Sequence, residues 1–246
     1  MIGAIFDGNA AGPGTDDPQR RDNSGTNFRI NDPPLLLGEI QYIWNGEKGD
    51  PGLAGKFKVG GWRHLGAFPD QRFTASGASI ASLPTPNMPA NLTGDYGIYS
   101  VFEQQVYRVG NDDDRGIGVF ARVSFSPSDR NLIDRYMDGG VEFVDLSDNR
   151  PKDKFGIAFG YAHVSFGAQA LDVDFQVLMG PTWPRRTSES VVTAVYQYEV
   201  RSGWTLQPNF QYFIRPGGGA TDPLGSNPGR TLNDAAVAGL RTVLKF

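Results

Sequence analysis

The chain contains no cysteine and only two histidines among its 246 residues. Disulfide bonds and cysteine-ligated metals are therefore excluded. The sequence also has no phosphate-binding loop and no metal-ligand cluster of the usual spacing, so we expect neither a cofactor nor a metal. The formal net charge of −4 lacks the basic footprint of nucleic-acid-binding proteins, and we expect no nucleic acid among the partners.

Long apolar runs are missing as well. No run approaches the ~18 residues of a membrane-spanning helix, and MIGAIFDGNAAGPG has neither the cationic start nor the apolar core of a signal peptide. A mean hydropathy of −0.36 is nevertheless compatible with a transmembrane barrel. In such a barrel lipid-facing and lumen-facing residues alternate, so the average looks soluble.

The last fourteen residues, NDAAVAGLRTVLKF, show such an alternation. Positions 238, 240, 244 and 246 are apolar and share a face with Thr242, whereas Arg241 and Lys245 lie on the opposite face. Successive side chains of a strand point to opposite faces, so the pattern predicts a β-strand. A chain terminus is normally frayed, but this pattern continues to the final residue and indicates a strand that is paired to its end.

Other segments repeat the pattern. GWTLQPNFQYFIRPGGG alternates for about twelve residues, longer than an ordinary strand and close to the ~9–11 residues that a tilted strand needs to cross a bilayer. ESVVTAVYQYEV precedes it, and the short RSG between them predicts a tight hairpin. LLLGEIQYIW, GIGVFARVSF and KFGIAFGYAHV alternate clearly, and FKVGGWRHLGAF, YGIYSVFEQQVYR, GGVEFVDL and IGAIF do so more weakly. We predict about ten strands and no sustained helix.

The expected connectors alternate in length. Long and short connectors follow one another along the chain. The long ones are 7–33, 69–93, 166–187 and 216–233, the short ones are 46–53, 109–115, 147–153 and 201–203, and 127–135 is intermediate. Outer-membrane barrels have short periplasmic turns and long extracellular loops. If the last strand ends in the periplasm, every short connector falls on the periplasmic side, which predicts an antiparallel transmembrane β-barrel.

At this point a family resemblance is visible. QPNFQYFIRPGGG followed by DAAVAGLRTVLKF resembles the closing hairpin of the carbohydrate-selective porin (OprB) family of Gram-negative outer membranes. FSPSDRNLIDRYMDGGVEF and NDPPLLLGEIQYIWN are also similar to segments of that family, so the resemblance covers nearly the whole chain. It implies a sixteen-stranded barrel in the Gram-negative outer membrane through which sugars diffuse passively.

Relative to that family, a signal peptide and about six strands are missing upstream. We therefore expect residues 1–246 to be a single porin barrel domain, here an all-β partial barrel of porin type with about ten strands. In this interpretation Met1 is an internal methionine or the start of a truncated gene. The resemblance implies mono- or oligosaccharides, outer-membrane lipid and the barrel assembly machinery as partners, and it allows a homo-oligomer.

Polar residues on the presumed inner face are the candidates for the sugar path, because they can replace a sugar's hydration and orient water. The set comprises Glu39, Gln41, Arg122, Glu142, Thr193, Gln197, Glu199, Gln207, Asn209, Gln211 and Arg241. Trp62 and Phe120 are candidates for stacking on sugars, although such residues more often serve packing. Leu240, Leu244 and Phe246 resemble the terminal signal that the barrel assembly machinery recognises.

Two acidic stretches, GNDDDRG (110–116) and LDVDF (171–175), suggest a calcium site, but neither has the central glycine and later glutamate of an EF-hand loop. We interpret both as solvated acidic turns. His163 and Ser165 share a face and would form half of a Ser–His dyad, but we favour a rim position at the membrane interface. We expect no enzyme; the alternatives are an outer-membrane β-barrel enzyme and a soluble β-sandwich sugar-binding protein.

We predict that deleting Phe246 from a full-length version reduces the amount of folded protein in outer membranes more than it reduces the stability of the finished barrel. The reason is that a terminal aromatic residue acts during assembly. Heat-modifiable mobility in gels measures the folded yield. An unchanged yield would show that the terminal residue carries no assembly signal.

Overall fold

The computed structural model describes residues 1–14, 16–26, 29–82, 88–147, 149–150, 152–222 and 229–245. Phe246 lies outside the described residues, so its proposed role in assembly stays a prediction. The described part contains ten strands, a 14-residue helix and two short helical turns.

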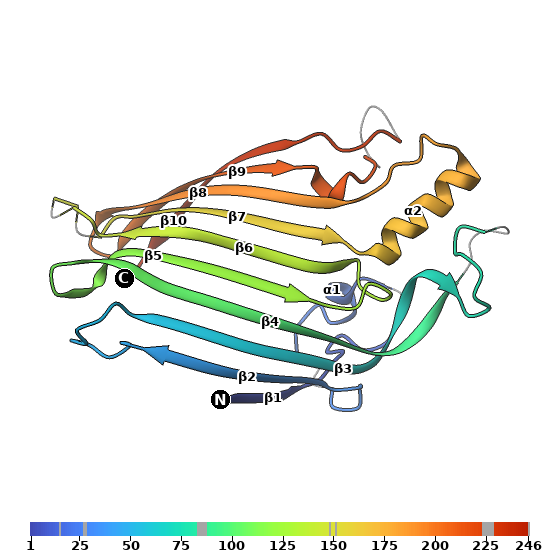
Figure 1. Cartoon of the computed structure of the whole chain (residues 1–246), viewed down its shortest axis with the longest axis horizontal. Coiled ribbons are helices and arrows are strands. Elements are labelled where there is room, and N and C mark those ends of the chain that lie inside the picture. The colour runs from blue at the N-terminus through green and yellow to red at the C-terminus, as the bar shows by residue number, and fades with distance from the viewer. Residues whose placement is uncertain are drawn as a thin grey trace.

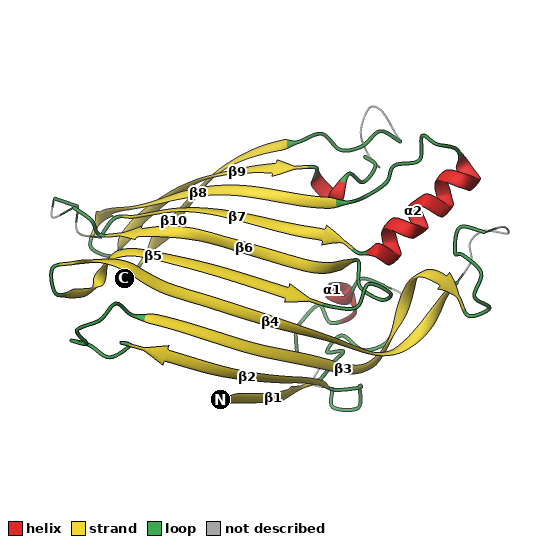
Figure 2. Ribbon diagram, in the orientation of Figure 1, coloured by secondary structure: helices red, strands yellow, loops and turns green. Residues whose placement is uncertain are grey.

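The strands form one antiparallel sheet in which every strand pairs with its neighbours in the chain (Figures 1 and 2). They are β1 (Ile2–Phe6), β2 (Leu35–Trp44), β3 (Gly55–Thr74), β4 (Pro89–Val109), β5 (Asp112–Phe125), β6 (Ile133–Val144), β7 (Lys154–Val164), β8 (Ser188–Arg201), β9 (Trp204–Ile214) and β10 (Ala235–Leu244). The sheet is strongly curved, and β10 passes behind the strands at the front of the view (Figure 1). The prediction of about ten antiparallel strands is confirmed.

Two strands are much longer than predicted. β3 has 20 residues and β4 has 21, so both ends of the connector expected at 69–93 continue these strands, over residues 69–74 and 89–93 (Figure 2). The register shifts between His64 and Ala67 and again between Pro69 and Thr74. Such bulges break the two-residue period, which is why the alternation did not reveal the extension.

The prediction of no sustained helix is wrong for α2 (Phe166–Met179). Ser165 caps its N-terminus by accepting a hydrogen bond from the backbone amide of Ala168, and Gly180 ends it with a φ of 106°, a conformation that glycine adopts at low cost. α1 (Pro18–Arg21) and the 3-10 turn η1 (Pro216–Gly218) are single turns. No helix in the described part of the chain has the length and apolar character that a membrane crossing requires.

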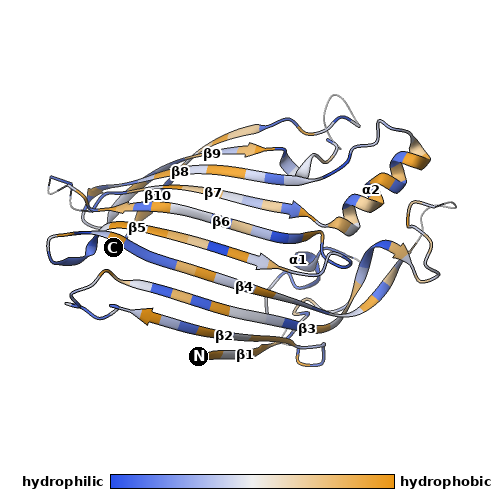
Figure 3. Cartoon of the chain, viewed as in Figure 1, coloured by the Kyte–Doolittle hydropathy of each residue, from blue (hydrophilic) through white to orange (hydrophobic). Residues whose placement is uncertain are grey.

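The sheet has two faces of different character, and Figure 3 shows hydrophobic and hydrophilic residues alternating along its strands. One face, here called the outward face, leaves large apolar side chains open: Leu240 is 70% exposed, Tyr42 68% and Phe210 49%. Among the described hydrophobic residues only Ala81, Val164 and Ala168 are buried. A soluble sandwich would bury its apolar faces against a second sheet, so this arrangement argues against the sandwich alternative.

We predict that Phe159→Arg lowers the free energy of unfolding in lipid vesicles by about 2–4 kcal/mol, the cost of an arginine on a lipid-facing strand at the bilayer midplane. Phe159 lies in the middle of β7 on the outward face and is 45% exposed. Ala158→Arg, its neighbour on the opposite face, serves as the matched control and is expected to cost far less. Equal losses for the two variants in urea titrations would contradict the assignment of faces.

Candidate functional site

All eleven residues proposed for the sugar path share one face of the sheet, here called the inner face. Directly paired residues of antiparallel strands place their side chains on the same side, and one row of pairs runs from Gln41 through Lys58, Val101 and Arg122 to Asp138. Parallel rows join Glu142 to Gly156 and Val195, Thr193 to Gln211, Asn209 to Val195, and Arg241 to Gln207. Trp62 and Phe120 lie on the same face. The role of this face in sugar passage stays a prediction.

The charges of the inner face are paired across strands. The guanidinium of Arg122 binds the carboxylate of Asp138 through two hydrogen bonds, with Nε 2.7 Å from Oδ1. The hydroxyl of Tyr136 donates to the same carboxylate at 2.8 Å. Nearby on β4, the carboxylate of Glu103 lies 3.5 Å from Nζ of Lys56 and 3.7 Å from Nζ of Lys58 on the neighbouring strand β3. These groups are therefore donors and acceptors held in place by ion pairs and hydrogen bonds within the wall.

A second rung is built on Glu39. Its carboxylate accepts hydrogen bonds from the amide of Gln41 and, at 2.8 Å, from the hydroxyl of Tyr99. The ring of Tyr99 reaches Glu39 by lying across Gly60, where an added Cβ would come within 2.4 Å of the ring. Phe120 similarly lies over Gly140, and Trp62 over Gly97. On the inner face, aromatic rings thus lie close over glycines of the neighbouring strand.

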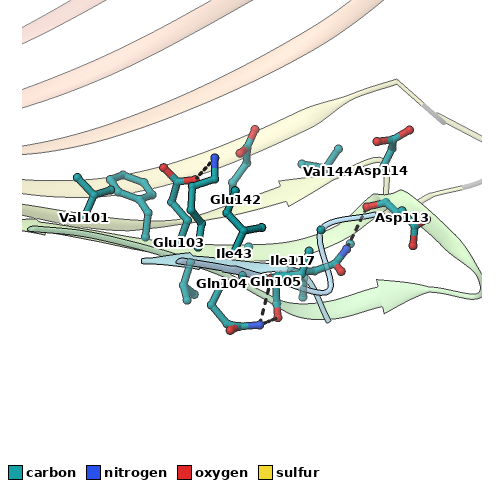
Figure 4. Close-up of a pocket in the computed structure, with 18 of the residues that line it drawn as sticks. Ile43, Val101, Glu103, Gln104, Gln105, Asp113, Asp114, Ile117, Glu142 and Val144 are labelled. Carbon is teal, nitrogen blue, oxygen red and sulfur yellow. Dashed lines mark hydrogen bonds and ion pairs between the residues drawn. The ribbon is translucent and has the colours of Figure 1, made fainter. Parts of the chain in front are cut away.

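An open hollow of about 780 Å³ lies beside β3 to β6, at the ends of these strands that adjoin the short connectors. Its wall includes Lys56, Glu103, Phe120, Arg122 and Glu142. Figure 4 shows Glu103 and Glu142 pointing into the space that faces the distant strands. A second hollow of about 210 Å³ shares Phe120 and Glu142 and adds Thr193, Gln197 and Gln207.

The structure therefore brings six of the thirteen path and stacking candidates around two adjoining hollows and leaves the others along the same face. Glu199 sits at the short-connector end, 3.0 Å from the ammonium of Lys152. The sequence interpretation missed Lys56, Lys58, Tyr99, Glu103, Tyr136 and Asp138, all on the inner face. Their strands were among the weaker candidates whose faces the pattern left open, and the alternating charges KFK and the EQQ run were the available signals.

The LDVDF stretch is not a solvated turn, because both aspartates lie on α2 and hold this helix in place. The carboxylate of Asp174 binds Arg72 of the β3 extension (Nε–Oδ2 2.8 Å) and accepts from the hydroxyl of Ser79 at 2.7 Å. Asp172 is 3% exposed and binds Arg186, with Nη2 2.8 Å from Oδ1. No group of three or more histidine or acidic side chains fit to hold a metal occurs among the described residues. In the other acidic stretch, GNDDDRG (110–116), Oδ1 of Asp113 lies 3.1 Å from Nη1 of Arg108.

His163 is part of a polar cluster at the base of α2 rather than of a dyad with Ser165. Its Nδ1 lies 2.7 Å from Oδ1 of Asp134, and its Nε2 lies 3.1 Å from the side-chain amide nitrogen of Gln169. The same nitrogen of Gln169 donates to the carbonyl of Val164 at 2.8 Å, so its two hydrogens are both used and Nε2 of His163 accepts. Ser165 is fully buried as the helix cap, which removes it as an accessible nucleophile.

Comparisons with known proteins agree on one family. The sequence model described as "Carbohydrate-selective porin, OprB family" matches residues 1–246. Porin B of Pseudomonas aeruginosa (strain PAO1) is 25% identical over 194 residues, which cover 73% of this chain and 40% of that protein. The chain thus spans well under two thirds of the length of this relative.

Two solved structures are similar as well. The high-pH structure of Pseudomonas putida OprB matches with a TM-score of 0.76 and 22% identity, over 94% of this chain and 53% of that one. The low-pH structure matches with a TM-score of 0.39 and 19% identity, over 89% and 59%. The first match supports the fold of the sheet.

We predict that α2 loosens from the β3 extension at acid pH. The hydrogen bonds from Arg72 lower the pKa of Asp174 below its ordinary value of 3.8, more than burial raises it. A carboxylate with a depressed folded pKa stabilises the fold fully above its unfolded pKa, and the stabilisation is lost as the pH falls below that value toward the folded pKa. Hydrogen exchange of residues 166–179, corrected for intrinsic rates, should therefore rise below about pH 4.

The variant Asp174→Asn is expected to exchange faster than the parent protein at neutral pH, since an amide cannot form the charged pair, and the difference should shrink below about pH 4. Asp16→Asn, at an exposed loop position, is the matched control and should behave as the parent protein does. Protection of α2 that stays constant from pH 7 to pH 3 in the parent protein would refute the role of this ion pair.

Proposed function

The chain belongs to the carbohydrate-selective porin (OprB) family over its whole length, and from this membership we propose that it forms a wall of an outer-membrane channel through which sugars diffuse passively. The observation that carries the proposal is the division of one curved sheet into an apolar outward face and a polar inner face. A bilayer stabilises the first face, and water and sugar hydroxyls occupy the second.

The inner face suits uncharged polyhydroxylated solutes. Some of its charged groups are fixed by their neighbours, as the Arg122–Asp138 and Glu39–Tyr99 pairs are. Such groups exchange hydrogen bonds with a passing sugar one at a time, and their paired charges reject neither sign strongly. Phe120 lies beside Arg122, with the guanidinium carbon 5.5 Å from the ring centroid, and offers an apolar surface to the C–H face of a sugar ring.

Closure of the channel requires strands beyond the ten described. Within the described part, β1 and β10 each pair on one side only, and open sheet edges are not tolerated in lipid. The length of Porin B, of which this chain covers 40%, supports a larger barrel. We therefore include in the proposal that the ten strands are one part of a single porin barrel domain, located in the outer membrane, that sugars cross without a catalytic step.

Liposome swelling in glucose tests this proposal. A version that carries the upstream strands should give fast swelling, whereas this chain alone should give little, because its sheet edges stay open. In the extended version, Glu142→Trp is expected to reduce the swelling rate to roughly half, since it narrows the space shared by both hollows. Phe143→Trp, the next residue on the outward face, is the matched control and should leave the rate unchanged.

Equal swelling by the two chain lengths would refute the need for further strands. Equal loss from Glu142→Trp and Phe143→Trp would refute the inner face as the sugar path. Swelling that no version supports would refute the channel itself.

A further inference from the structure

A third hollow lies on the outward face, away from the face proposed for sugar passage. It has a volume of about 500 Å³, and its outward-facing side chains are Leu36, Arg63, Tyr96 and Ile98. The register places Leu36, Arg63 and Tyr96 in one row across β2, β3 and β4, with Gly38, Gly61 and Ile98 in the next row. A Cβ added at Gly38 would meet no heavy atom within 4 Å, so the hollow is open space against the backbone.

The rim of this hollow carries a cation without an acidic partner. Arg63 is exposed, and none of the ion pairs in the described ranges involves it. Tyr96, its direct partner on β4, is 52% exposed. Asp95, the nearest acid on that strand, is 4% exposed; it pairs in register with His64 on the inner face and accepts from the side-chain amide of Asn131 at 2.9 Å. Its charge is therefore turned away from Arg63.

A second guanidinium lies close by. Arg130 donates to the carbonyl oxygens of Thr93 and Gly94, and a Cβ added at Gly94 would lie 3.5 Å from Nη2 of Arg63. The two cations thus flank one peptide group. Arg130 is neutralised by Asp129 at 2.8 Å, which leaves Arg63 as the group available to an anion.

The height of Arg63 fits the boundary of a bilayer. It lies eight residues beyond Gly55, the first residue of β3, which is about 26 Å along the strand at roughly 3.3 Å per residue. A tilt of roughly 40° reduces this to about 20 Å of height, against an apolar band roughly 25 Å tall. Long cationic side chains and tyrosines are favoured at such boundaries, where they meet lipid headgroups.

We propose that this hollow binds one anionic membrane lipid, with a phosphate against Arg63 and the hydroxyl of Tyr96 and an acyl chain lying over Gly38 and Gly61. The assignment rests on the proposed function, because it requires the outward face to contact lipid. Charge complementarity favours this occupant over a second copy of the chain, which would need to supply a carboxylate to a hollow whose other walls are apolar.

The test uses the version that carries the upstream strands, purified from membranes, and measures lipid retained per chain by native mass spectrometry. Phosphatidylglycerol and phosphatidylcholine with identical acyl chains are the probes. We expect one retained phosphatidylglycerol, preferred over phosphatidylcholine by about fivefold, as one interfacial arginine predicts. Arg63→Gln should abolish the preference, and Gly38→Leu should reduce the retention of both lipids because it fills the hollow without a clash.

Lys48→Gln, which removes an exposed cation at the opposite end of the sheet, is the control and should retain phosphatidylglycerol as the parent protein does. Retention unaffected by Arg63→Gln would overturn the proposal. Displacement of the lipid by an equal concentration of inorganic phosphate would also overturn it, since the site would then recognise a free anion. A change of oligomeric mass in Gly38→Leu, with no lipid retained by the parent, would assign the hollow to a second copy instead.

Glucose swelling, measured on the version that carries the upstream strands, separates this proposal from the channel. Lost lipid preference with unchanged swelling supports the lipid site and the channel together. A protein that retains phosphatidylglycerol through Arg63 but conducts no sugar would refute the channel and leave the lipid site standing.

Discussion

The register of antiparallel pairing is the constraint on which the rest of the structure depends. A shift of one residue in any pairing would move every side chain of that strand to the other face. The apolar residues of β7 and β9 face outward only because Ile157 pairs with Ala194, and Ala194 with Phe210. The same pairings bring Thr193 beside Gln211 on the inner face. Hydrogen bonding between backbones thus decides both what meets lipid and what meets solute.

On the inner face the register also decides the electrostatics. Arg122 and Asp138 lie on different strands and meet because they are direct partners in the ladder. Lys56 and Lys58 reach the single carboxylate of Glu103 from either side. Because these charges come from adjacent strands, the ion pairs form within the wall rather than across the open space.

The sequence predicted strands best where alternation was unbroken. β9 and β10 could be assigned to faces from residues such as Gln211 and Phe210, and the structure places these as expected. The sequence pattern failed to predict the C-terminal part of β3, because the bulges next to His64 and Pro69 interrupt the two-residue period. It failed for α2 because this helix buries Gln169 and Asp172 and leaves Val177 85% exposed. A helix held by ion pairs from distant segments leaves no apolar period to read.

The glycines that lie beneath aromatic rings have a consequence for how the width of the proposed channel is encoded. Tyr99, Phe120 and Trp62 lie close to the wall because Gly60, Gly140 and Gly97 have no side chains beneath them. A methyl group added at Gly60 would meet only the ring of Tyr99 and would push it away from the wall. At Gly97 and Gly140 an added methyl group would also meet backbone oxygens, so the strand itself would have to shift. The width of the proposed channel is therefore encoded partly by glycines, which contribute no side chain to the lining. Variation among relatives at these positions would alter permeability while every recognised lining residue stayed the same.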